Sequence, residues 1–471
     1  MRFINRRAEL ARLDAVTGGG LAILYGRRRI GKSRLLVEWA KKRKGVYYVA
    51  DQSAPDVQRR YLATAVASML PGFADVEYPD WRSLFARLAT DSERAEYRGP
   101  VIIDELPYLV VTSPELPSVL QQWLDHGAKE AKLAVALAGS SQRMMQGLVL
   151  DHSAPLFGRA DELFELLPLE PAHIREVFRT RAPRDAIEVF AAWGGVPRYW
   201  ELAERVSADV CRQVSHLVLD PAGPLHQEPD RLLIEEIPSA VEVRPVLDAI
   251  GGGAHRVSEI AGRLGTPATS LSRPLARLVA MGIVRREVPF GEPPRKSRRS
   301  LYKISDPFFR LWFCVVAPHR SQLAAGSEAS RHKIMSRYWQ GLKAATWEDL
   351  CRAGLPNIRA TSRLGKIGPW EPGSRWWHAN APEWDIVAMA MEGKTLLLGE
   401  AKLTDRPLSK RMAQQMTQAL SARPQPALPT HLSGHGAVKA LFVPALAHGV
   451  PTRMGDVVIV TAADFGIFKA R

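Results

Sequence analysis

The segment LAILYGRRRIGKS, close to the N-terminus, constrains the fold more than any other part of the chain. Leu21–Tyr25 is an apolar run typical of a buried strand, and Arg34–Ala40 favours a helix. Between them lies the pattern G-x-x-x-x-G-K-S, which ends at Ser33. Gly26 and Gly31 let the backbone bend tightly and turn its N–H groups toward an anion, which the following helix N-terminus also favours. The segment predicts a loop that binds nucleotide phosphates; a chance glycine-rich turn is the alternative.

The side chains of this loop suit ATP and Mg²⁺, which we predict as cofactors. Lys32 is expected to reach the β- and γ-phosphates, and the hydroxyl of Ser33 is expected to ligate Mg²⁺. The predicted cofactor-binding residues of the loop are Gly26, Arg27, Arg28, Arg29, Ile30, Gly31, Lys32 and Ser33.

An acidic pair follows a second apolar run, in the segment Pro100–Pro107. Asp104 is expected at the C-terminal end of a strand, where it can hold Mg²⁺ directly or through water. Glu105 can polarise the attacking water as a general base. An acidic pair after a strand also arises by chance, but it does so less often after a phosphate-binding loop at this separation.

Further strands and helices alternate in this part of the chain, which predicts an α/β fold with a mainly parallel sheet and a ligand at the C-terminal ends of its strands. Another buried strand, Leu133–Ser141, ends in small polar residues. Ser140 or Ser141 is either a sensor of the γ-phosphate or a simple helix N-cap. The remaining predicted elements are a strand at Val46–Ala50 and helices at Ala8–Val16, Trp81–Ala89 and Pro114–His126.

Several short motifs follow one another along the chain: FINRRAEL from Phe3, YGRRRIGKS from Tyr25, IDEL from Ile103, AGSS from Ala138, PLFGR from Pro155 and GGVPR from Gly194. In this order they resemble the archaeal-type ATPase family, a branch of the STAND and AAA-like P-loop ATPases. The resemblance implies that Arg159 is a phosphate-sensing or finger-type arginine, that Pro197 packs near the adenine, and that Phe3 and Arg6 close over the base. Without the resemblance, Gly194 and Gly195 indicate only the end of a helix, and Arg159 indicates only an exposed cation after a turn.

The charge of the chain points to a polyanionic partner. Its 471 residues include 64 Lys and Arg against 49 Asp and Glu, a formal net charge of +15. Nucleic acid is the expected partner, with DNA as the first candidate. The alternative is that the basic surface mainly keeps the protein soluble. The cysteines Cys211, Cys314 and Cys351 are too widely separated for a disulfide framework or a metal cluster. Without a signal peptide or a bilayer-spanning apolar run, we expect a cytoplasmic protein with no membrane partner.

The middle of the chain, residues 206–326, predicts a winged helix-turn-helix. Helical patterns at Val257–Leu264 and Thr269–Met281 flank a Gly-Thr-Pro turn, and a strand begins at Ile283. Contact with DNA and a role as a lid that follows nucleotide state, which the family resemblance implies, both remain open. The following segment, 306–313, is rich in large apolar residues, and we interpret it as part of the hydrophobic core. The predicted nucleic-acid contacts are Ser270, Ser272, Arg273 and Arg277 of the recognition helix and Arg295, Lys296, Arg298 and Arg299 of the wing.

The C-terminal region, residues 327–471, carries the second set of candidate catalytic residues. Strands are expected at Pro382–Ala388 and Lys394–Leu403, joined by a short turn into a hairpin. Asp385 then lies beside Glu400 and Lys402, which project from one face. Two carboxylates suit Mg²⁺, and a lysine can orient water or offset developing charge. An ordinary ion pair on a surface hairpin is the alternative.

This arrangement resembles the PD-(D/E)xK restriction-nuclease-like superfamily. Glu348, on a helix predicted at Ile334–Arg352, matches the first acid, Asp385 the central acid, and Glu400 with Lys402 the E-x-K pair. The proline that usually precedes the central acid is absent, because Trp384 stands there. The resemblance implies that Glu348, Asp385, Glu400 and Lys402 are catalytic and that Asp385 and Glu400 hold a metal.

Together these patterns predict a P-loop ATPase domain with a helical extension at 1–205, a winged-helix region at 206–326 and a nuclease-like domain at 327–471. We expect nucleotide state to control a Mg²⁺-dependent nuclease that acts on nucleic acid, with defence against foreign DNA as one role. The alternative is a nucleotide-switched DNA-binding or regulatory ATPase whose nuclease-like domain is inactive. Assembly into a homo-oligomer is left open.

Overall fold

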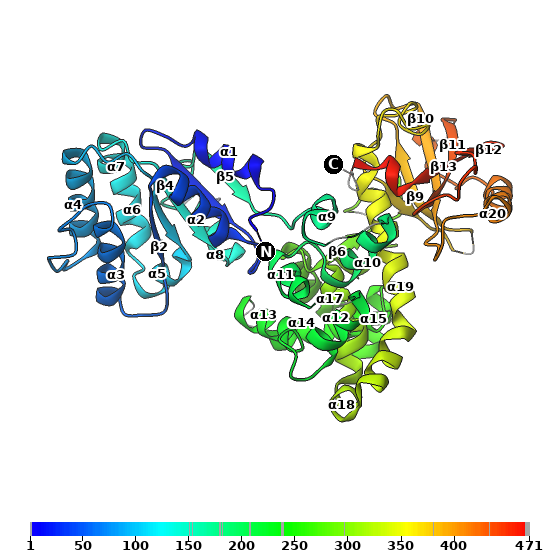
Figure 1. Cartoon of the computed structure of the whole chain (residues 1–471), viewed down its shortest axis with the longest axis horizontal. Helices are drawn as coiled ribbons and strands as arrows, with labels where there is room; N and C mark the ends of the chain where they lie inside the picture. Colours follow the sequence, from blue (N-terminus) through cyan, green and yellow to red (C-terminus); the bar gives the residue numbers. More distant parts are fainter. Residues whose placement is uncertain are drawn as a thin grey trace. The chain divides into compact units, whose positions relative to one another are not determined.

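The computed structural model describes residues 2–466 apart from Leu150, Ser153, Arg179, Arg181, Ser207, Ala208, 237–239, Lys296, Asn380 and Ser433. The chain divides into two compact units (Figure 1). The first comprises Met1–Leu169 together with Val196–Arg198, and the second comprises Glu170–Gly195 and Tyr199–Arg471.

The first unit is built around a parallel sheet whose strands follow the order β2-β3-β4-β1-β5 (Figure 1). Strand β4 therefore lies between β1, which leads into the phosphate-binding loop, and β3, which ends in the acidic pair. The strands are β1 (Leu21–Tyr25), β2 (Val46–Val49), β3 (Val101–Asp104), β4 (Val135–Gly139) and β5 (Glu162–Glu165).

Alternating side chains of these strands form two hydrophobic cores, one on each face of the sheet. Leu21 and Ile23 pack with residues of α3, α4 and α6, whereas Ala22 and Leu24 pack with residues of α1 and α2. Both faces are covered, as a parallel sheet requires. The helices are α1 (Arg7–Ala15), α2 (Lys32–Arg43), α3 (Pro55–Ala67), α4 (Trp81–Arg94), α5 (Leu106–Thr112), α6 (Leu116–Asp125), α7 (Gly127–Glu130) and α8 (Gln142–Val149).

The predicted strands and helices of this unit are confirmed, with shifts of a few residues at their ends. Helices α3 and α5 and the edge strand β5 are not predicted from the sequence. In β5, only Phe164 is fully buried and two of its residues are acidic, so the strand lacks the apolar run that marks its neighbours.

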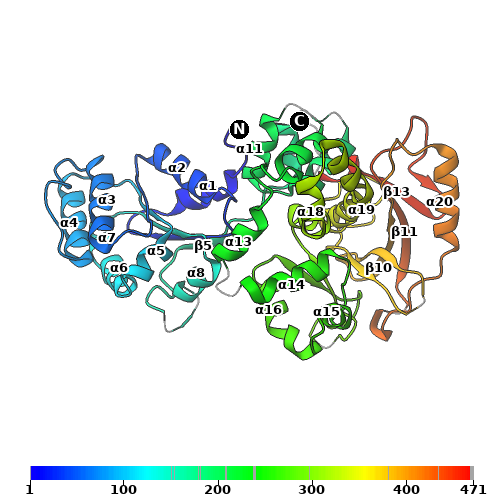
Figure 2. The ribbon, with the colours of Figure 1, turned by 90° about the horizontal axis from the view of Figure 1, so that it is seen from below.

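The second unit begins with helices and then contains the predicted winged-helix order. The three helices α14 to α16 gather in one cluster, and β6 pairs with β7 in antiparallel fashion (Figure 2). The elements are α9 (Ile174–Val177), α10 (Pro183–Trp193), α11 (Pro197–Arg205, whose start belongs to the first unit), α12 (Val210–Val214), α13 (Glu228–Glu236), α14 (Ala240–Gly251), α15 (Val257–Leu264), α16 (Ser272–Ala280), β6 (Val284–Glu287), β7 (Leu301–Ile304), α17 (Pro307–Leu311) and α18 (Ala317–Ala325).

Apolar packing explains the winged-helix elements. Leu271, Leu275 and Leu278 are buried on the inner face of α16 and its preceding turn. The apolar segment after β7 is also packed, since Phe308 and Trp312 are fully buried. Its interpretation as core is therefore confirmed.

The C-terminal part of the second unit is a mixed sheet of order β12-β13-β11-β10-β9-β8. Strands β8, β9 and β10 are antiparallel neighbours, whereas β10 and β11 run parallel, with α20 between them in the chain. The predicted hairpin is confirmed by the pairing of β9 with β10. The elements are α19 (Glu328–Gly354), β8 (Ser374–Trp376), β9 (Trp384–Met389), β10 (Thr395–Ala401), α20 (Lys410–Ala422), β11 (Gly436–Val443), β12 (Arg453–Met454) and β13 (Val457–Thr461).

Within the described part of the chain, no helix combines the length and apolar character needed to cross a membrane.

Candidate functional site

The phosphate-binding loop connects the C-terminal end of β1 to α2. Gly26, Arg29 and Gly31 have positive φ angles of 150°, 66° and 97°. A Cβ atom on Gly26 would lie 2.7 Å from the carbonyl oxygen of Leu166, so only glycine fits there. Lys32 starts α2 and is 4% exposed, and its Nζ donates to the carbonyl oxygens of Gly26 (2.7 Å) and Arg27 (3.1 Å). The loop and its lysine thus form a tight cationic turn at a helix N-terminus, which fits a polyphosphate.

Two arginines hold the loop against its surroundings. Arg28 donates from Nη2 to the Tyr108 hydroxyl at 2.7 Å. Arg6 donates from Nη2 to the carbonyl oxygens of Ile30 (3.2 Å) and Leu167 (2.7 Å) and is 6% exposed. Arg6 therefore braces the loop backbone in this structure, and closure of Phe3 and Arg6 over the base remains a prediction.

Ser33 and Asp104 meet at a residue that the sequence analysis missed, Tyr47 of β2. The Tyr47 hydroxyl donates to Asp104 Oδ2 at 2.9 Å and also interacts with the Ser33 side chain. Burial and the negative charge of Asp104 raise the pKa of Tyr47, so the phenol keeps its proton. Because one hydroxyl reaches both predicted Mg²⁺ ligands, Ser33 and Asp104 fit a shared cation.

Glu105 follows Asp104 in the left-handed backbone region, with φ 55°. Its carboxylate accepts from the Ser140 backbone N–H (Oε2, 3.1 Å) and from the Ser140 hydroxyl. Ser141 instead accepts from the backbone N–H of Met144, at 3.5 Å, near the start of α8. Of the two serines, Ser140 is thus the one in contact with the candidate general base.

Arg159 precedes β5 and lies near the N-terminal ends of the strands, whereas the phosphate-binding loop follows the C-terminal end of β1. Its guanidinium pairs with Asp125, at 3.0 Å (Nε to Oδ1) and 2.9 Å (Nη2 to Oδ2). Two residues further on, Asp161 accepts from the N–H of Leu21, at the beginning of β1, whereas the loop follows the strand's end. This corrects the expectation that Arg159 senses the phosphate of its own chain; a finger role would require a second copy.

Pro197, in contrast, lies beside the loop. A Cβ atom on Gly31 would be 3.7 Å from Cγ of Pro197, and both residues belong to the first unit. Its contact with the adenine remains a prediction.

Comparison with known proteins agrees with this geometry. Residues 3–202 match a family described as an ATPase domain predominantly from Archaea. This match and the geometry of the loop support a P-loop ATPase domain at the amino-terminal end of the chain. Residues 312–416 match a second family, described as archaeal and bacterial proteins of unknown function.

Individual relatives extend over much of the chain. An uncharacterised protein of Methanocaldococcus jannaschii is 27% identical over 418 residues, which are 87% of this chain and 90% of the relative. The structure of a Walker-type ATPase of Pyrococcus abyssi aligns with a TM-score of 0.52 at 20% identity, over 66% of this chain and 96% of that one. The ORC2 protein of Aeropyrum pernix aligns with a TM-score of 0.45 at 13% identity, over 72% of this chain and 95% of that one. The likeness to the Pyrococcus ATPase shows a shared fold.

The C-terminal candidate residues lie where β9 starts and β10 ends. The Asp385 carboxylate accepts from the Ala401 N–H at 3.1 Å. Glu400 is 14% exposed, and its Oε1 lies 2.6 Å from Nζ of the more exposed Lys402. The structure therefore brings Asp385, Glu400 and Lys402 to adjoining ends of two paired strands.

Arg423, which the sequence analysis missed, contacts this site from the end of α20. Its Nη2 pairs with Oε2 of Glu400, its Nη1 donates to the Glu383 carbonyl oxygen at 2.9 Å, and its guanidinium lies 5.1 Å from the ring centre of Trp384. Trp384, at the position where the resembled superfamily usually has proline, thus supports a cation beside Glu400. No local sequence pattern marks Arg423, because it is 23 residues from Glu400.

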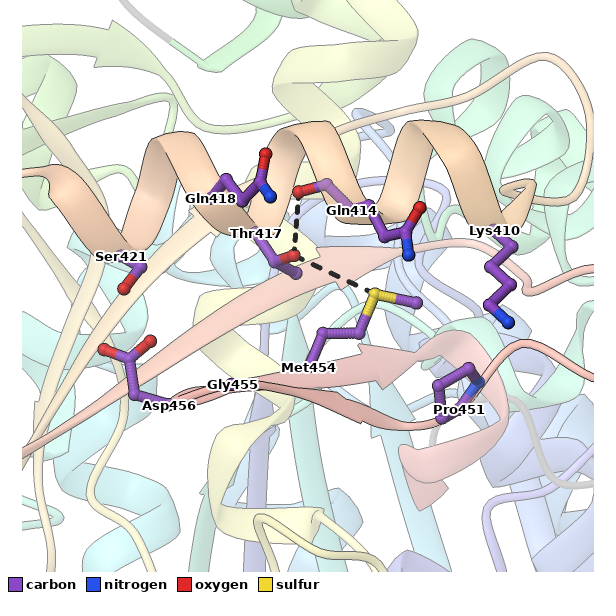
Figure 3. A pocket seen from close by; sticks show the side chains of 9 residues that line it. All are labelled: Lys410, Gln414, Thr417, Gln418, Ser421, Pro451, Met454, Gly455 and Asp456. Atoms are coloured by element: carbon purple, nitrogen blue, oxygen red, sulfur yellow. Dashed lines mark hydrogen bonds between the residues drawn. The ribbon is translucent and has the colours of Figure 1, made fainter.

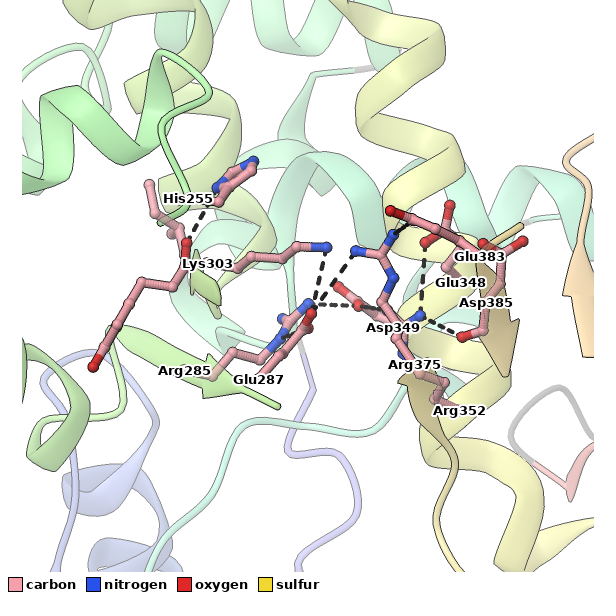
Figure 4. Close-up of polar contacts among 12 residues, drawn as sticks. His255, Arg285, Glu287, Lys303, Glu348, Asp349, Arg352, Arg375, Glu383 and Asp385 are labelled. Atoms are coloured by element: carbon pink, nitrogen blue, oxygen red, sulfur yellow. Dashed lines mark hydrogen bonds and ion pairs between the residues drawn. The ribbon is translucent and has the colours of Figure 1, made fainter. Parts of the chain in front are cut away.

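Glu348 reaches the same region from α19. Burial and the charge of Asp385 raise the pKa of Glu348. Arg352 lies between the two acids, with Nη1 3.6 Å from Oε2 of Glu348 and 2.9 Å from the backbone oxygen of Asp385 (Figure 4). The four predicted nuclease-like residues therefore belong to one neighbourhood.

The predicted Mg²⁺ site in this neighbourhood does not fit a resident ion in the observed arrangement. Carboxylates are ligands that Mg²⁺ prefers, so Asp385 and Glu400 are suitable in kind. Both oxygens of Glu400 are, however, already paired with cations, one with Lys402 and the other with Arg423. Across the described residues, no group of three or more His, Cys, Asp or Glu side chains is arranged to hold a metal ion.

The predicted nucleic-acid residues differ in their availability. Ser270, Ser272, Arg273, Arg295 and Arg298 are exposed, as a contact surface requires. The other two described ones are engaged, because Arg277 lies 4.0 Å from Glu242 and Arg299 pairs with Glu292. Lys296 lies outside the described residues.

A separate groove of about 330 Å³ runs between α20 and the β12–β13 pair (Figure 3). It is lined by polar side chains that include Lys410, Gln414 and Asp456. None of the predicted catalytic residues lines this groove, so it is distinct from the neighbourhood of Asp385 and Glu400.

Proposed function

We propose that nucleotide state in the ATPase domain controls a nuclease activity of the C-terminal domain. The proposed substrate is nucleic acid, with DNA as the first candidate. The observation that carries the proposal is the meeting of Asp385, Glu400 and Lys402 at paired strand ends, with Glu348 close by. The order helix, three antiparallel strands, helix and parallel strand, from α19 to β11, supports a restriction-nuclease-like core.

In the ATPase domain, the loop N–H groups and Lys32 bind and neutralise the phosphates. Glu105 orients and deprotonates the attacking water, and its contact with Ser140 fixes the carboxylate for that role. Ser33 and Asp104 would hold Mg²⁺, which would supply charge neutralisation at the phosphates.

In the C-terminal domain, Lys402 orients the attacking water or offsets the charge that develops on the phosphate. The carboxylates of Asp385 and Glu400 hold Lys402 and the neighbouring backbone in place. The exposed cations of the winged helix, Arg273, Arg295 and Arg298, supply sequence-independent contacts to the nucleic-acid backbone.

A second candidate function is favoured by Arg423. Because Arg423 and Lys402 both pair with Glu400, the C-terminal domain could grip nucleic acid without cutting it. The protein would then be a nucleotide-switched binding module, with the winged helix as DNA contact or lid. Assembly of several copies is compatible with either function.

A cleavage assay separates the two functions. Single- and double-stranded DNA and RNA are incubated with the full chain and Mg²⁺, with and without ATP. The variants are E400A and K402A, and the matched controls E392A and K394A change exposed residues of the same hairpin. Cleavage lost in the first pair and kept in the second supports the nuclease. Binding without cleavage by the unaltered protein supports the second function.

A further inference from the structure

Asp349 of α19 is surrounded by three arginines from different elements. Its carboxylate lies 2.6 Å from Nη2 of Arg285 on β6 and 2.5 Å from Nη2 of Arg352 on α19 itself (Figure 4). It also lies 2.5 Å from Nη2 of Arg310 on α17. Burial by itself raises the pKa of Asp349, but the three positive charges outweigh it and hold the pKa well below its usual range. We call these four residues the Asp349 network.

Arg352 connects this network to the candidate nuclease residues. It is 7% exposed, so few alternative positions are open to its guanidinium. One nitrogen, Nη2, pairs with Asp349, while the other, Nη1, donates to the backbone oxygen of Asp385 and faces Glu348. A shift of Asp349 would therefore move Arg352 and change its contacts with Asp385 and Glu348.

A second set of contacts runs beside the first. Glu287, two residues after Arg285 on β6, lies 2.7 Å from Nε of Arg285 and 3.9 Å from Nη1 of Arg375 on β8. Arg375 in turn pairs with Glu383 at 3.0 Å, and its backbone oxygen accepts from the N–H of Phe290 at 2.8 Å. The strand β6 and the start of the wing are thus attached to the edge of the C-terminal sheet just before Asp385.

Charge balance makes these contacts hard to break singly. Removing one member of a partly dehydrated ion network leaves its partners uncompensated, which costs more than the net contribution of the pair. The arginines and acids therefore favour one arrangement of β6 relative to α19 and β9. Movement of the winged helix has to displace Arg285 from Asp349, which changes the charge around the carboxylate that Arg352 also contacts.

We propose that the Asp349 network is a positioning device, through which the winged helix sets the geometry of the candidate nuclease residues. Arg285 and Asp349 act through Arg352, so they are positioning residues. An effect of this network on cleavage rests on the nuclease function proposed above. Its effect on the geometry of β9 and β10 does not depend on that function.

The test compares two neighbouring arginines of β6 in the full chain. R285Q removes the network's winged-helix partner, whereas R286Q removes an equal charge from the exposed, opposite face of the same strand. Backbone hydrogen exchange is followed in the peptide that covers residues 384–402. We expect R285Q to accelerate exchange there by about tenfold, and R286Q to leave it unchanged. Equal exchange in the two variants would overturn the proposal.

A conservative variant and a double variant distinguish positioning through Arg352 from a general loss of stability. R285K keeps the charge and is expected to restore most of the protection. If R285Q does not fold, D349N replaces it in the comparison, because it removes the carboxylate that Arg285 and Arg352 share. The effects of R285Q and R352Q on exchange should be non-additive, because both act on one contact chain, while those of R286Q and R352Q should add. Additive effects of R285Q and R352Q would contradict action through Arg352.

Cleavage adds an independent readout. If the unaltered chain cuts nucleic acid, R285Q should lower kcat by about tenfold with KM unchanged, because it disturbs placement rather than binding. If the unaltered chain cuts nothing, the proposed nuclease function fails, while the exchange experiment still decides the positioning role.

Discussion

The guanidinium of Arg423 pairs with the carboxylate of Glu400, the residue that the sequence marks as a metal ligand. The same carboxylate is shared with Lys402, and Arg423 is further held by the Glu383 backbone and the Trp384 ring. A divalent cation at Glu400 would therefore have to compete with a bound arginine. The two proposed functions therefore make different predictions about whether this ion pair opens to a cation.

Replacing Arg423 should open Glu400 to divalent cations. R423Q is expected to tighten Mn²⁺ binding by about tenfold, equivalent to about 1.4 kcal/mol, because a competing cation is removed. Isothermal titration of the full chain with Mn²⁺ measures the change. R411Q, which alters an exposed arginine on the same helix, is the control. Unchanged Mn²⁺ affinity in R423Q would show that Arg423 does not compete for the site.

The buried lysine of the phosphate-binding loop should dominate ATP affinity. K32A is expected to weaken ATP binding by at least about tenfold, because a charge-assisted hydrogen bond contributes about 1.5–3 kcal/mol. The exposed Lys41 near the other end of α2 provides the control K41A. Titration with a fluorescent ATP analogue gives both affinities. Equal affinities in K32A and K41A would remove Lys32 from the nucleotide site.

Loss of the Tyr47 hydroxyl should weaken the connection between Ser33 and Asp104. Y47F leaves the fully buried Asp104 without one donor, at a cost of about 1–3 kcal/mol in the free energy of unfolding. We also expect slower ATP hydrolysis. Urea unfolding and phosphate release measure the two effects. Y61F, at a tyrosine that is 50% exposed, should change neither. A Y47F protein with unaltered stability and hydrolysis would mean that the hydroxyl is dispensable.

Because of the Asp349 network, the free energy of unfolding should decrease as the pH falls into the acidic range. The pKa of Asp349 is lowered in the folded chain, so the unfolded chain takes up its proton first as pH falls. The stabilisation is fully present above the ordinary aspartate pKa of about 3.9 and is lost as pH falls from there toward the lowered folded value.

D349N should therefore flatten this part of the pH profile. Melting temperatures of the unaltered chain and of D349N are compared from neutral pH down to the acid range. The difference between the two proteins is expected to be largest near pH 7 and to shrink with acidification. A difference that stays constant over the whole range would show that Asp349 does not titrate in this way.

Wing cations should contribute unequally to binding of DNA. R298Q removes an exposed arginine and should reduce the salt dependence of binding by about one unit of slope. R299Q should have a smaller effect, since Arg299 is already paired with Glu292. Affinities measured over a series of salt concentrations test both. Identical slopes for R298Q, R299Q and the unaltered protein would exclude Arg298 and Arg299 from the DNA contact.

The parts of the fold and sites that could be predicted from the sequence are those with local causes. The run from Leu21 to Ser33 contains its strand, loop and helix in one stretch, and the E-x-K spacing puts Glu400 and Lys402 on one face by strand geometry alone. Tyr47, Arg352 and Arg423 were missed, because their partners come from other elements and nothing in their own surroundings marks them. Arg159 was misplaced for the same reason, since only the pairing of β5 with β1 shows that the segment before β5 lies near the N-terminal ends of the strands.

The most direct test of the central claim is cleavage measured against ATP. Full-length protein is incubated with nucleic acid and Mg²⁺ over a range of ATP concentrations, in parallel with K32A and E400A. We expect cleavage that changes with ATP in the unaltered chain, cleavage that no longer responds to ATP in K32A, and no cleavage in E400A. Cleavage that is the same at every ATP concentration, or that persists in E400A, would contradict control of a nuclease site at Glu400 by the phosphate-binding loop.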